Sequence, residues 1–237
     1  MRKKAREKEG SIVQDRELRL FLEFIPEEKR MDATSVFTPE KAEKGWRVCE
    51  EGERADFIFL VEEGTFEMVN LYGDGKVYIH GFLYPGDIFG EAWLYEHDTY
   101  PYTVAAREDG MVWRARGNDL KPFIQGVPRM EEYLRVLLGE KLEQYMYKAR
   151  CIAGERVEKR IACVLLKVVS ERGIFEGCQA RLDTPLTNRD IAGLVGSTEE
   201  TVSRVMSRLK KEGVIGTEGK ALVVKDTAGL RRYFSEL

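Results

Sequence analysis

Closely spaced glycines divide the stretch from Val36 to Trp113 into short apolar runs, and this spacing constrains the fold more than any other feature. Eight glycines fall between residues 45 and 90 and separate runs such as "FIFLV". Short strands that recur every 8–12 residues between turn signals are typical of a β-sandwich or barrel. The Asp74-Gly75 dipeptide indicates a tight hairpin turn inside this region.

The sequence on either side of this region is predicted to be mainly helical. Residues 1–14 form a basic tail, and "RELRLFLEFIP" predicts a short helix that stops before Pro26. "RVEKRIACVLLKVVSERG" predicts an amphipathic helix that ends at Gly173. "TAGLRRYFSEL" closes the chain after "GTEGKALVVKD", a predicted two-stranded wing that turns at Glu218-Gly219.

A long helix is predicted to begin after Pro128. Its apolar residues keep three- and four-residue spacing over more than three heptads, which favours a dimerisation seam over packing against its own domain. The seam residues are Met130, Leu134, Leu138, Leu142, Tyr145, Ala149 and Ile152.

Two short helices are predicted near the C-terminus. Thr187 caps the first, with Asp190 as its capping-box partner, and Gly196 supplies the positive φ of a tight turn. Ser197 or Thr198 caps the second, whose apolar side holds Val202, Val205, Met206 and Leu209. Two short helices joined by a glycine turn predict a helix-turn-helix. An α-helix with a polar outer face fits the DNA major groove, so the second helix is expected to present its side chains to the bases.

The outer face of the second helix supplies candidate DNA contacts. Arg204 can pair with guanine in bidentate fashion, and Glu200 can accept from cytosine N4, although Glu200 can also serve as a capping-box residue for Ser197. Lys210 and Lys211 suit phosphates, which position the protein without specifying sequence. The remaining candidates for phosphate or other DNA contacts are Thr198, Glu199, Thr201 and Arg208.

Composition limits the other classes of function. The 237 residues suggest one or two domains of an ordinary globular protein. No apolar window spans a bilayer and no signal peptide follows the basic tail, so we expect a cytoplasmic protein without membrane contact. Residues 155–237 hold 15 basic and 12 acidic residues, a net charge of +3, against 23 and 29, a net charge of −6, elsewhere. This asymmetry suits a C-terminal module that approaches a polyanion.

The cysteines give no sign of a metal or redox motif. Cys49, Cys151, Cys163 and Cys178 are scattered without a CxxC pair. Neither a zinc site nor a redox dithiol is indicated. No triad spacing, paired metal ligands or phosphate loop appears either, so we expect no enzyme activity.

Taken together, the motifs resemble the cyclic-AMP receptor protein / fumarate–nitrate regulator (CRP/FNR) superfamily of bacterial transcription factors over roughly residues 30–230. The segments that carry the resemblance are "KGWRVCEEGERADFIFLVEEGTFEMV", "GDIFGE", the long helix and, most specifically, "IAGLVGSTEETVSRVMSRLKKEGVI". The resemblance implies an α+β chain with an N-terminal double-stranded β-helix, a dimerisation helix and a C-terminal winged helix-turn-helix. The expected limits are 1–127 for the effector-binding domain, 128–154 for the dimer helix and 155–237 for the DNA-binding domain.

The resemblance also implies how the protein works. Glu200, Ser203 and Arg204 fall at the base-reading positions of the family, and the Ser203-Arg204 pair is closer to the fumarate–nitrate regulator branch. That branch implies a homodimer on a palindromic DNA site with TTGAT-like half-sites, about 34 Å apart. Double-stranded DNA, a second copy of the chain and RNA polymerase are the implied partners. Glu199 stands where the cyclic-AMP branch has an arginine.

The effector site departs from the cyclic-nucleotide pattern of the family. Gly90 and Glu91 match its first part, where the resemblance makes the glutamate the acceptor of a ribose hydroxyl. Tyr100 and Pro101 stand where an arginine and a serine would bind the cyclic phosphate. Without a counter-charge a buried phosphate is disfavoured, and the nearest cation in sequence, Arg107, is not expected to face inward. A cyclic nucleotide is therefore not the expected effector.

Other effectors and cofactors stay open at this point. Trp93, Tyr95, Tyr100 and Tyr102 suit an aromatic or other organic effector, as in the halogenated-phenol branch, or they simply fill the core. A haem on His80 or His97, as in the gas-sensing branch, is an alternative, whereas an iron–sulfur cluster is disfavoured because residues 1–48 contain no cysteine. No cofactor is certain. A cyclic-nucleotide-responsive regulator and a nucleotide-binding module without DNA function are the remaining alternatives.

Overall fold

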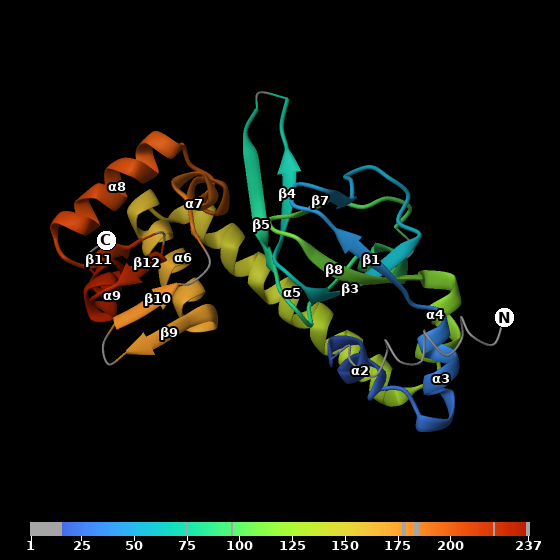
Figure 1. Ribbon diagram of the computed structural model, residues 1–237. Coiled ribbons are helices and arrows are strands. Elements are labelled where there is room, and N and C mark those ends of the chain that lie inside the picture. The colour runs from blue at the N-terminus through green and yellow to red at the C-terminus, as the bar shows by residue number, and fades with distance from the viewer. Residues whose placement is uncertain are drawn as a thin grey trace. The chain divides into compact units, whose positions relative to one another are not determined.

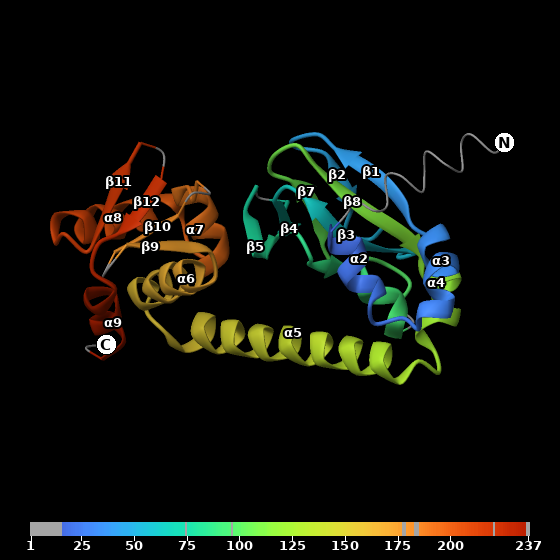
Figure 2. The same ribbon diagram turned by 60° about the horizontal axis from the view of Figure 1, so that its bottom comes forward.

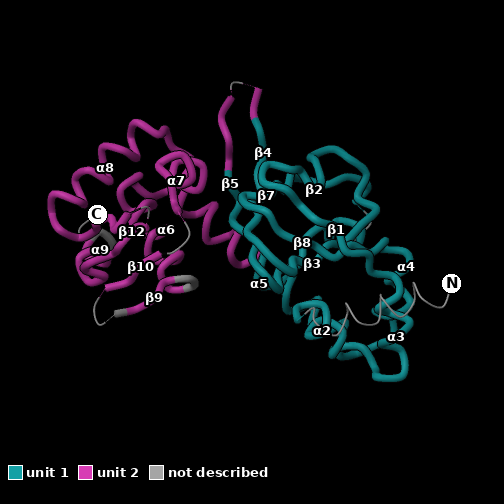
Figure 3. Tube along the Cα trace, viewed as in Figure 1, with its two compact units in different colours: residues 1–71, 79–141 teal, residues 72–78, 142–237 magenta. Residues whose placement is uncertain are grey.

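The structure is a computed structural model that describes residues 16–73, 75–95, 97–176, 179–182, 185–219 and 221–235. The tail at 1–14, Asp74 of the expected hairpin turn, Cys178 and the side chain of Tyr95 lie outside the described residues. The chain divides into two compact units (Figure 3). The first comprises Met1–Leu71 and Ile79–Lys141, and the second comprises Tyr72–Tyr78 and Leu142–Leu237.

The first unit is a β-roll of two four-stranded sheets (Figure 1). One sheet has the order β1 (Thr38–Ala42), β8 (Gly110–Arg116), β3 (Phe57–Glu63), β6 (Ile88–Phe89). The other has the order β2 (Arg47–Cys49), β7 (Thr103–Ala106), β4 (Phe66–Leu71), β5 (Val77–Leu83). The pairings β1–β8, β3–β8, β3–β6, β2–β7 and β4–β7 are all antiparallel. The expected glycine-punctuated β-domain is therefore confirmed.

Strand β3 is buried on both faces, which explains its unbroken "FIFLV" run. Phe59 and Val61 point into a core between the sheets, where Phe59 stacks on Phe89 with ring centroids 4.8 Å apart. Ile58 and Leu60 alternate with them and enter a second core on the other face. Successive side chains of a strand point to opposite faces, so a strand covered on both sides must be apolar throughout.

Helices cover this second face of β3. They are α2 (Arg16–Leu22), α3 (Glu27–Ser35), α4 (Gly117–Ile124) and the first half of α5 (Pro128–Gly154). The expected helix before Pro26 is α2, whereas α3 and α4 had no counterpart among the sequence predictions. A short 3₁₀ helix, η1 (Glu91–Tyr95), follows β6.

A buried carboxylate joins α2 to the sheet. Glu62 is only 8 % exposed, and its two oxygens accept from the backbone amides of Glu17 and Leu18, each at 3.1 Å. The indole Nε1 of Trp113 donates to the same carboxylate at 3.0 Å. Amides in the first turn of a helix have no partner within the helix, so Glu62 supplies the missing acceptor for α2.

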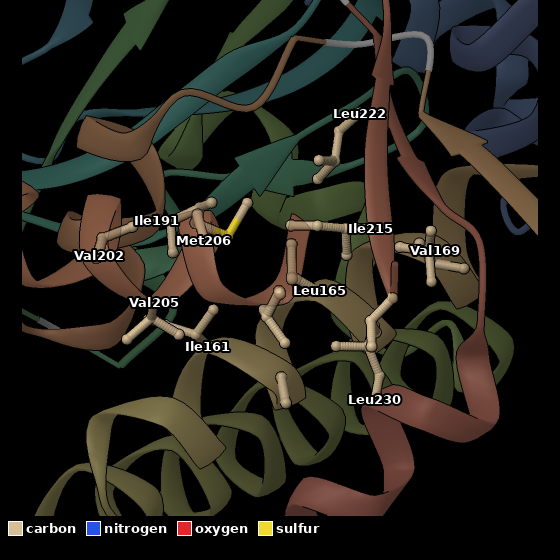
Figure 4. Close-up of a cluster of buried hydrophobic side chains, with 14 of the residues drawn as sticks. Ile161, Leu165, Val169, Ile191, Val202, Val205, Met206, Ile215, Leu222 and Leu230 are labelled. Atoms are coloured by element: carbon tan, nitrogen blue, oxygen red, sulfur yellow. The ribbon is translucent and has the colours of Figure 1, made fainter. Parts of the chain in front are cut away.

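The second unit packs helices against a small sheet. Its helices, besides the second half of α5, are α6 (Val157–Arg172), α7 (Asn188–Val195), α8 (Glu199–Lys211) and α9 (Thr227–Ser235). The sheet has the order β11 (Ile215–Glu218), β12 (Ala221–Val224), β10 (Gln179–Leu182), β9 (Gly173–Glu176). The core gathers residues of α6, α7, α8, α9 and the sheet, among them Leu165, Ile191, Met206, Ile215 and Leu230 (Figure 4).

The α+β fold class is thus confirmed: a β-roll, a long helix and a C-terminal helix-turn-helix with a wing. The wing is larger than expected, because β9 and β10 extend the predicted two strands to four. Helix α5 runs unbroken from Pro128 to Gly154, as predicted (Figure 2). None of the described helices is long and apolar enough to cross a membrane.

Candidate nucleic-acid interface and effector site

The helix-turn-helix is built by local capping chemistry. Thr187 caps α7, and its hydroxyl accepts from the Asp190 amide at 3.1 Å while the Asp190 carboxylate accepts from the Thr187 amide at 2.9 Å. Gly196 ends α7 in the left-handed region with φ of 62°. A residue with a Cβ is strained in that conformation, so glycine favours the sharp turn between α7 and α8.

Helix α8 begins at a second cap. The Thr198 hydroxyl accepts from the Thr201 amide at 3.2 Å, which selects Thr198 over Ser197 as the capping residue. The apolar side of α8 is buried, with Val202, Val205, Met206 and Leu209 all in the core of the unit. This fixes the opposite side of the helix toward solvent.

The side of α8 that faces solvent carries the predicted base-reading residues. Glu200, Ser203 and Arg204 are all exposed and lie within little more than one helical turn. The candidate phosphate contacts differ in their surroundings. Thr198, Glu199, Lys210 and Lys211 are exposed, and Thr201 is half-buried.

Arg208 has a partner within the unit. Its Nη2 lies 3.5 Å from Oε1 of Glu158 on α6. This ion pair holds the late part of α8 against α6, and about half of the Arg208 side chain remains exposed. The wing follows α8 directly, and its β11–β12 turn contains Gly219 with φ of 60°.

Glu91, at the start of η1 in the other unit, is buried but fully partnered. Its Oε2 accepts from the Tyr102 hydroxyl at 3.0 Å, and its Oε1 lies 2.8 Å from Nζ of Lys141 on α5. Lys141 Nζ also donates to the Ile88 carbonyl at 2.9 Å. The carboxylate is therefore neutralised by a cation of the chain itself, Lys141, which was not among the residues predicted for this site.

Gly90 brings the backbone close to β3 at this site. Its φ is 79°, and a Cβ there would lie 2.6 Å from the Phe57 carbonyl oxygen. The Gly90 amide donates to the Tyr102 hydroxyl at 3.1 Å. Tyr102 thus both accepts and donates, and burial together with the neighbouring Glu91 charge raises the pKa of its phenol well above the ordinary value.

Tyr100, the residue expected at the arginine position of the cyclic-nucleotide pattern, has its hydroxyl hydrogen-bonded to backbone groups. Its hydroxyl accepts from the Phe57 amide at 3.1 Å and donates to the Phe57 carbonyl at 3.0 Å. Burial raises the pKa of this phenol, so it carries no charge at neutral pH. Pro101 is exposed, and its carbonyl accepts from the Asn70 amide group at 2.9 Å.

The structure places the candidate aromatic residues in two different cores. Tyr100 and Tyr102 lie between the sheets. Trp93 packs instead with the helices on the outer face of β3, and its indole nitrogen is buried without a hydrogen-bond partner. The structure therefore does not bring Trp93 together with the two tyrosines.

The remaining candidate residues of the β-roll are Arg107, His80 and His97, and each contacts another group of the protein. Arg107 Nη1 pairs with the Glu67 carboxylate at 2.9 Å, and its guanidinium lies over the Phe82 ring. His80 contacts the Asn70 side chain, and His97 Nδ1 lies 2.8 Å from the Thr99 carbonyl oxygen. The described residues contain no cluster of three or more His, Cys, Asp or Glu side chains that could hold a metal ion.

The predicted seam of α5 divides into two parts. Met130 and Leu134 are buried in the core of their own unit. From Leu142 onward the apolar residues are exposed, with Leu142 at 60 % and Met146 at 65 %. Met146 was not among the predicted seam residues. The predicted members of this second part besides Leu142 are Tyr145, Ala149 and Ile152, all exposed, while Leu138 between the two parts is half-buried.

Comparison with known proteins agrees with this architecture. Residues 39–126 match the model of the cyclic nucleotide-binding domain, and residues 159–233 match the model of the Crp-like helix-turn-helix domain. The transcriptional regulator LdrP of Thermus thermophilus is 30% identical over 181 residues, which cover 76% of this chain and 89% of that protein. A CRP-like cAMP-activated global transcriptional regulator of Mycobacterium tuberculosis is 29% identical over 202 residues, 84% of this chain and 89% of that protein.

Solved structures show the same fold. FixK2 from Bradyrhizobium japonicum superimposes with a TM-score of 0.74 at 24% identity, over 84% of this chain and 97% of that one. The similarity covers the β-roll, the long helix and the helix-turn-helix in one chain, and the relatives are transcription regulators rather than enzymes. This chain therefore belongs to the CRP/FNR family of DNA-binding transcription regulators.

Proposed function

We propose that the chain acts as a homodimer that reads a palindromic DNA site through α8 and regulates transcription there. The observation that carries this proposal is the two-sided character of α8, whose apolar side is buried while Glu200, Ser203 and Arg204 face solvent together. In this proposal Arg204 pairs with a guanine in the major groove and Glu200 accepts from a cytosine. The half-sites are TTGAT-like.

The remaining DNA contacts are proposed for groups that position the protein. Thr198, Glu199, Thr201, Arg208, Lys210 and Lys211 surround the base-reading residues on α8 and its cap. Lys210 and Lys211 neutralise phosphates, and RNA polymerase is the proposed partner at the promoter. Arg208 keeps its ion pair with Glu158 and offers its exposed half to the backbone.

Selection of the DNA site from a random duplex library tests this part of the proposal. The purified full chain is expected to enrich an inverted repeat whose half-sites lie one helical turn apart. Enrichment of a single, non-repeated site would contradict the homodimeric mode. A failure to enrich any sequence over the starting library would contradict sequence-specific binding altogether.

The homodimer is supported by the exposed stripe on α5. Leu142, Tyr145, Met146 and Ala149 recur at spacings of three, one and three residues, and therefore share one face of the helix. Contiguous exposed apolar surface of this kind is a common mark of a protein–protein contact. The same face of a second copy is the occupant that a two-fold axis would bring to it.

We also propose that the effector of the β-roll is not a cyclic nucleotide. The Mycobacterium relative is described as cAMP-activated, but at the two positions where the family pattern places the phosphate-binding pair this chain has Tyr100 and Pro101. The Tyr100 hydroxyl is bound to the Phe57 backbone, and Glu91, the expected ribose acceptor, is bound to Tyr102 and Lys141. An uncharged or aromatic organic molecule is the proposed effector class.

A second candidate is a regulator that needs no effector. The contact between Lys141 and Glu91 favours an effector-independent regulator, because the Lys141 ammonium already pairs with the carboxylate that a ligand would have to bind. Titration calorimetry with cyclic AMP is expected to show no binding, and saturable heat would contradict the exclusion of cyclic nucleotides. Mass spectrometry of small molecules released from the purified protein separates the two candidates, because only an effector-controlled regulator is expected to carry or respond to one.

A further inference from the structure

Cys151 and Cys163 are neighbours at the junction of α5 and α6, although they are twelve positions apart in the sequence. Cys151 is near the end of α5, and Cys163 is on α6. The Tyr147 hydroxyl donates to Cys163 Sγ at 3.6 Å. Cys151 follows Tyr147 by one helical turn, so the two side chains lie on the same side of α5. Its thiol is a near neighbour of both the Tyr147 hydroxyl and the Cys163 thiol.

Both thiols are free and partly exposed, unlike the thiol of Cys49. Cys151 and Cys163 are half-buried, whereas Cys49 is 2 % exposed inside the β-roll. Burial raises the pKa of Cys49 to about 12, so almost none of it is thiolate at neutral pH. Cys49 therefore behaves as an inert core residue, and the pair at the α5–α6 junction has both the access and the neighbouring thiol that oxidation requires.

We propose that Cys151 and Cys163 form a hydroperoxide-oxidised dithiol site whose disulfide ties the end of α5 to α6 within one chain. One thiolate attacks an oxygen of hydrogen peroxide, so that an S–O bond forms and the O–O bond breaks, with hydroxide leaving and taking up a proton to give water. The second thiol then attacks the sulfenic sulfur and loses its proton. The S–S bond forms, the S–O bond breaks and a second water leaves. Two thiols have lost two electrons, and one peroxide has accepted them.

The two cysteines have different roles in this sequence. Burial raises the pKa of Cys163, which holds it as the thiol, although the hydrogen bond from Tyr147 and the charge of Lys159 act in the opposite direction. The Tyr147 hydroxyl also donates to Cys163 Sγ at 3.6 Å, which ties up one lone pair of that sulfur. We therefore assign the first attack on peroxide to Cys151 and the resolving attack to Cys163.

The site is compatible with a dimer through α5. Cys151 comes nine residues after Leu142, which is two and a half helical turns. It therefore lies on the side of α5 opposite the exposed stripe around Leu142 and Met146. A partner copy on that stripe leaves Cys151 accessible to a small oxidant.

Treatment of the full chain with equimolar hydrogen peroxide, followed by tryptic digestion without reductant, tests the proposal directly. Trypsin releases "CIAGER" and "IACVLLK" as separate peptides, because Arg150, Arg156, Arg160 and Lys167 bound them. The expected product is one species containing both peptides, lighter by two hydrogen atoms than their sum, and dithiothreitol should remove it. Cys151→Ser and Cys163→Ser should each abolish it, and Cys49→Ser should leave its yield unchanged.

Trapping with dimedone tests the assigned roles. In the Cys163→Ser protein the sulfenic acid cannot be resolved, so a dimedone adduct should accumulate on "CIAGER". The Cys151→Ser protein should give at least tenfold less adduct on "IACVLLK". Absence of the linked peptide in the wild-type chain, or a disulfide found only between two chains on a non-reducing gel, would overturn the proposed site. Equal adduct formation on both peptides would overturn the order of attack.

Discussion

Lys141 Nζ lies 2.8 Å from Glu91 Oε1, and through this contact helix α5 supplies the counter-charge for a carboxylate buried in the β-roll. The pair joins residues fifty positions apart. The Lys141 side chain is 20% exposed and that of Glu91 is 8% exposed, so water screens the pair only partly. Loss of Lys141 leaves the Glu91 carboxylate poorly hydrated and without a counter-ion, and loss of Glu91 leaves the Lys141 ammonium in the same state.

Lys141→Met should lower the free energy of unfolding by about 3 kcal/mol, because it leaves Glu91 buried without its cation. Urea denaturation measures this change. Lys121→Met, at an exposed position of α4, is the matched control and should change stability by less than about 0.5 kcal/mol. The double variant Glu91→Gln/Lys141→Met should be more stable than Lys141→Met alone, and equal stability would show that the two charges are not coupled.

Glu62→Ala should destabilise the first unit by about 2 kcal/mol or more. The substitution removes the acceptor for the amides of Glu17 and Leu18 and for the Trp113 indole. Thermal unfolding followed by the fluorescence of the tryptophans measures the loss. The control is Glu63→Ala, at the neighbouring exposed residue of β3, which should lose little stability. A loss as large as that of Glu62→Ala would argue against the capping role of Glu62.

Arg204→Ala should weaken binding to the selected DNA site by ~1–3 kcal/mol and relax the preference at one base pair of each half-site. Lys211→Ala, which removes a proposed phosphate contact, should weaken binding equally for all sequences and reduce the salt slope by about one. Competition gel shifts with single-base variants distinguish the two. Unchanged base preference in Arg204→Ala would remove this residue from the base-reading set.

Leu142→Glu combined with Met146→Glu should convert the protein from dimer to monomer at micromolar concentration. The change places two charges in the exposed apolar stripe, where a second copy would have to desolvate both. Analytical ultracentrifugation measures the outcome. Val136→Glu is a suitable control, since Val136 is also exposed but lies six residues before Leu142, on a different face of α5. A stable dimer of the double variant would place the interface elsewhere.

Stability should depend on pH through Lys148. Burial first, and then the charge of Lys167, lowers the pKa of Lys148 from 10.5 to about 7. Between those two values the unfolded chain binds the proton and the folded chain does not, so stability rises as pH rises from about 7 to about 10. Lys148→Met should flatten this rise and stabilise the protein below pH 7, on the order of 3 kcal/mol. Denaturant midpoints of both proteins across this range measure it, and identical profiles would contradict the burial of a neutral amine.

The parts of the structure that follow from local chemistry were predictable. The cap at Thr187, the turn at Gly196 and the buried side of α8 each depend on residues within a few positions of one another. The β-roll was predictable as a class, since its glycines and apolar runs reflect the period of strands. Its pairing order and the cover provided by α3 and α4 were not.

The contacts that depend on distant segments could not be predicted. Strand β10 pairs with β12, whose residues come some forty positions later, and the short stretch from Gln179 to Leu182 carries little apolar signal of its own. Lys141 had no reason to stand out among the charged residues of a helix until the fold brought it to Glu91. Trp93 and Tyr102 are close in sequence, but β3 separates the cores that they enter.

The burial of Met130 and Leu134 fixes the first half of α5 in its own unit, so the exposed stripe on the second half is already helical in a single chain. In the proposed dimer, association then needs no refolding step, and two newly synthesised chains can pair on encounter. Below the dissociation constant, the concentration of pairs grows with the square of the concentration of chains. If the chain pairs through α5 in this way, a modest rise in expression would give a disproportionate rise in occupied palindromic sites, and the transcriptional response to protein abundance would be steeper than linear.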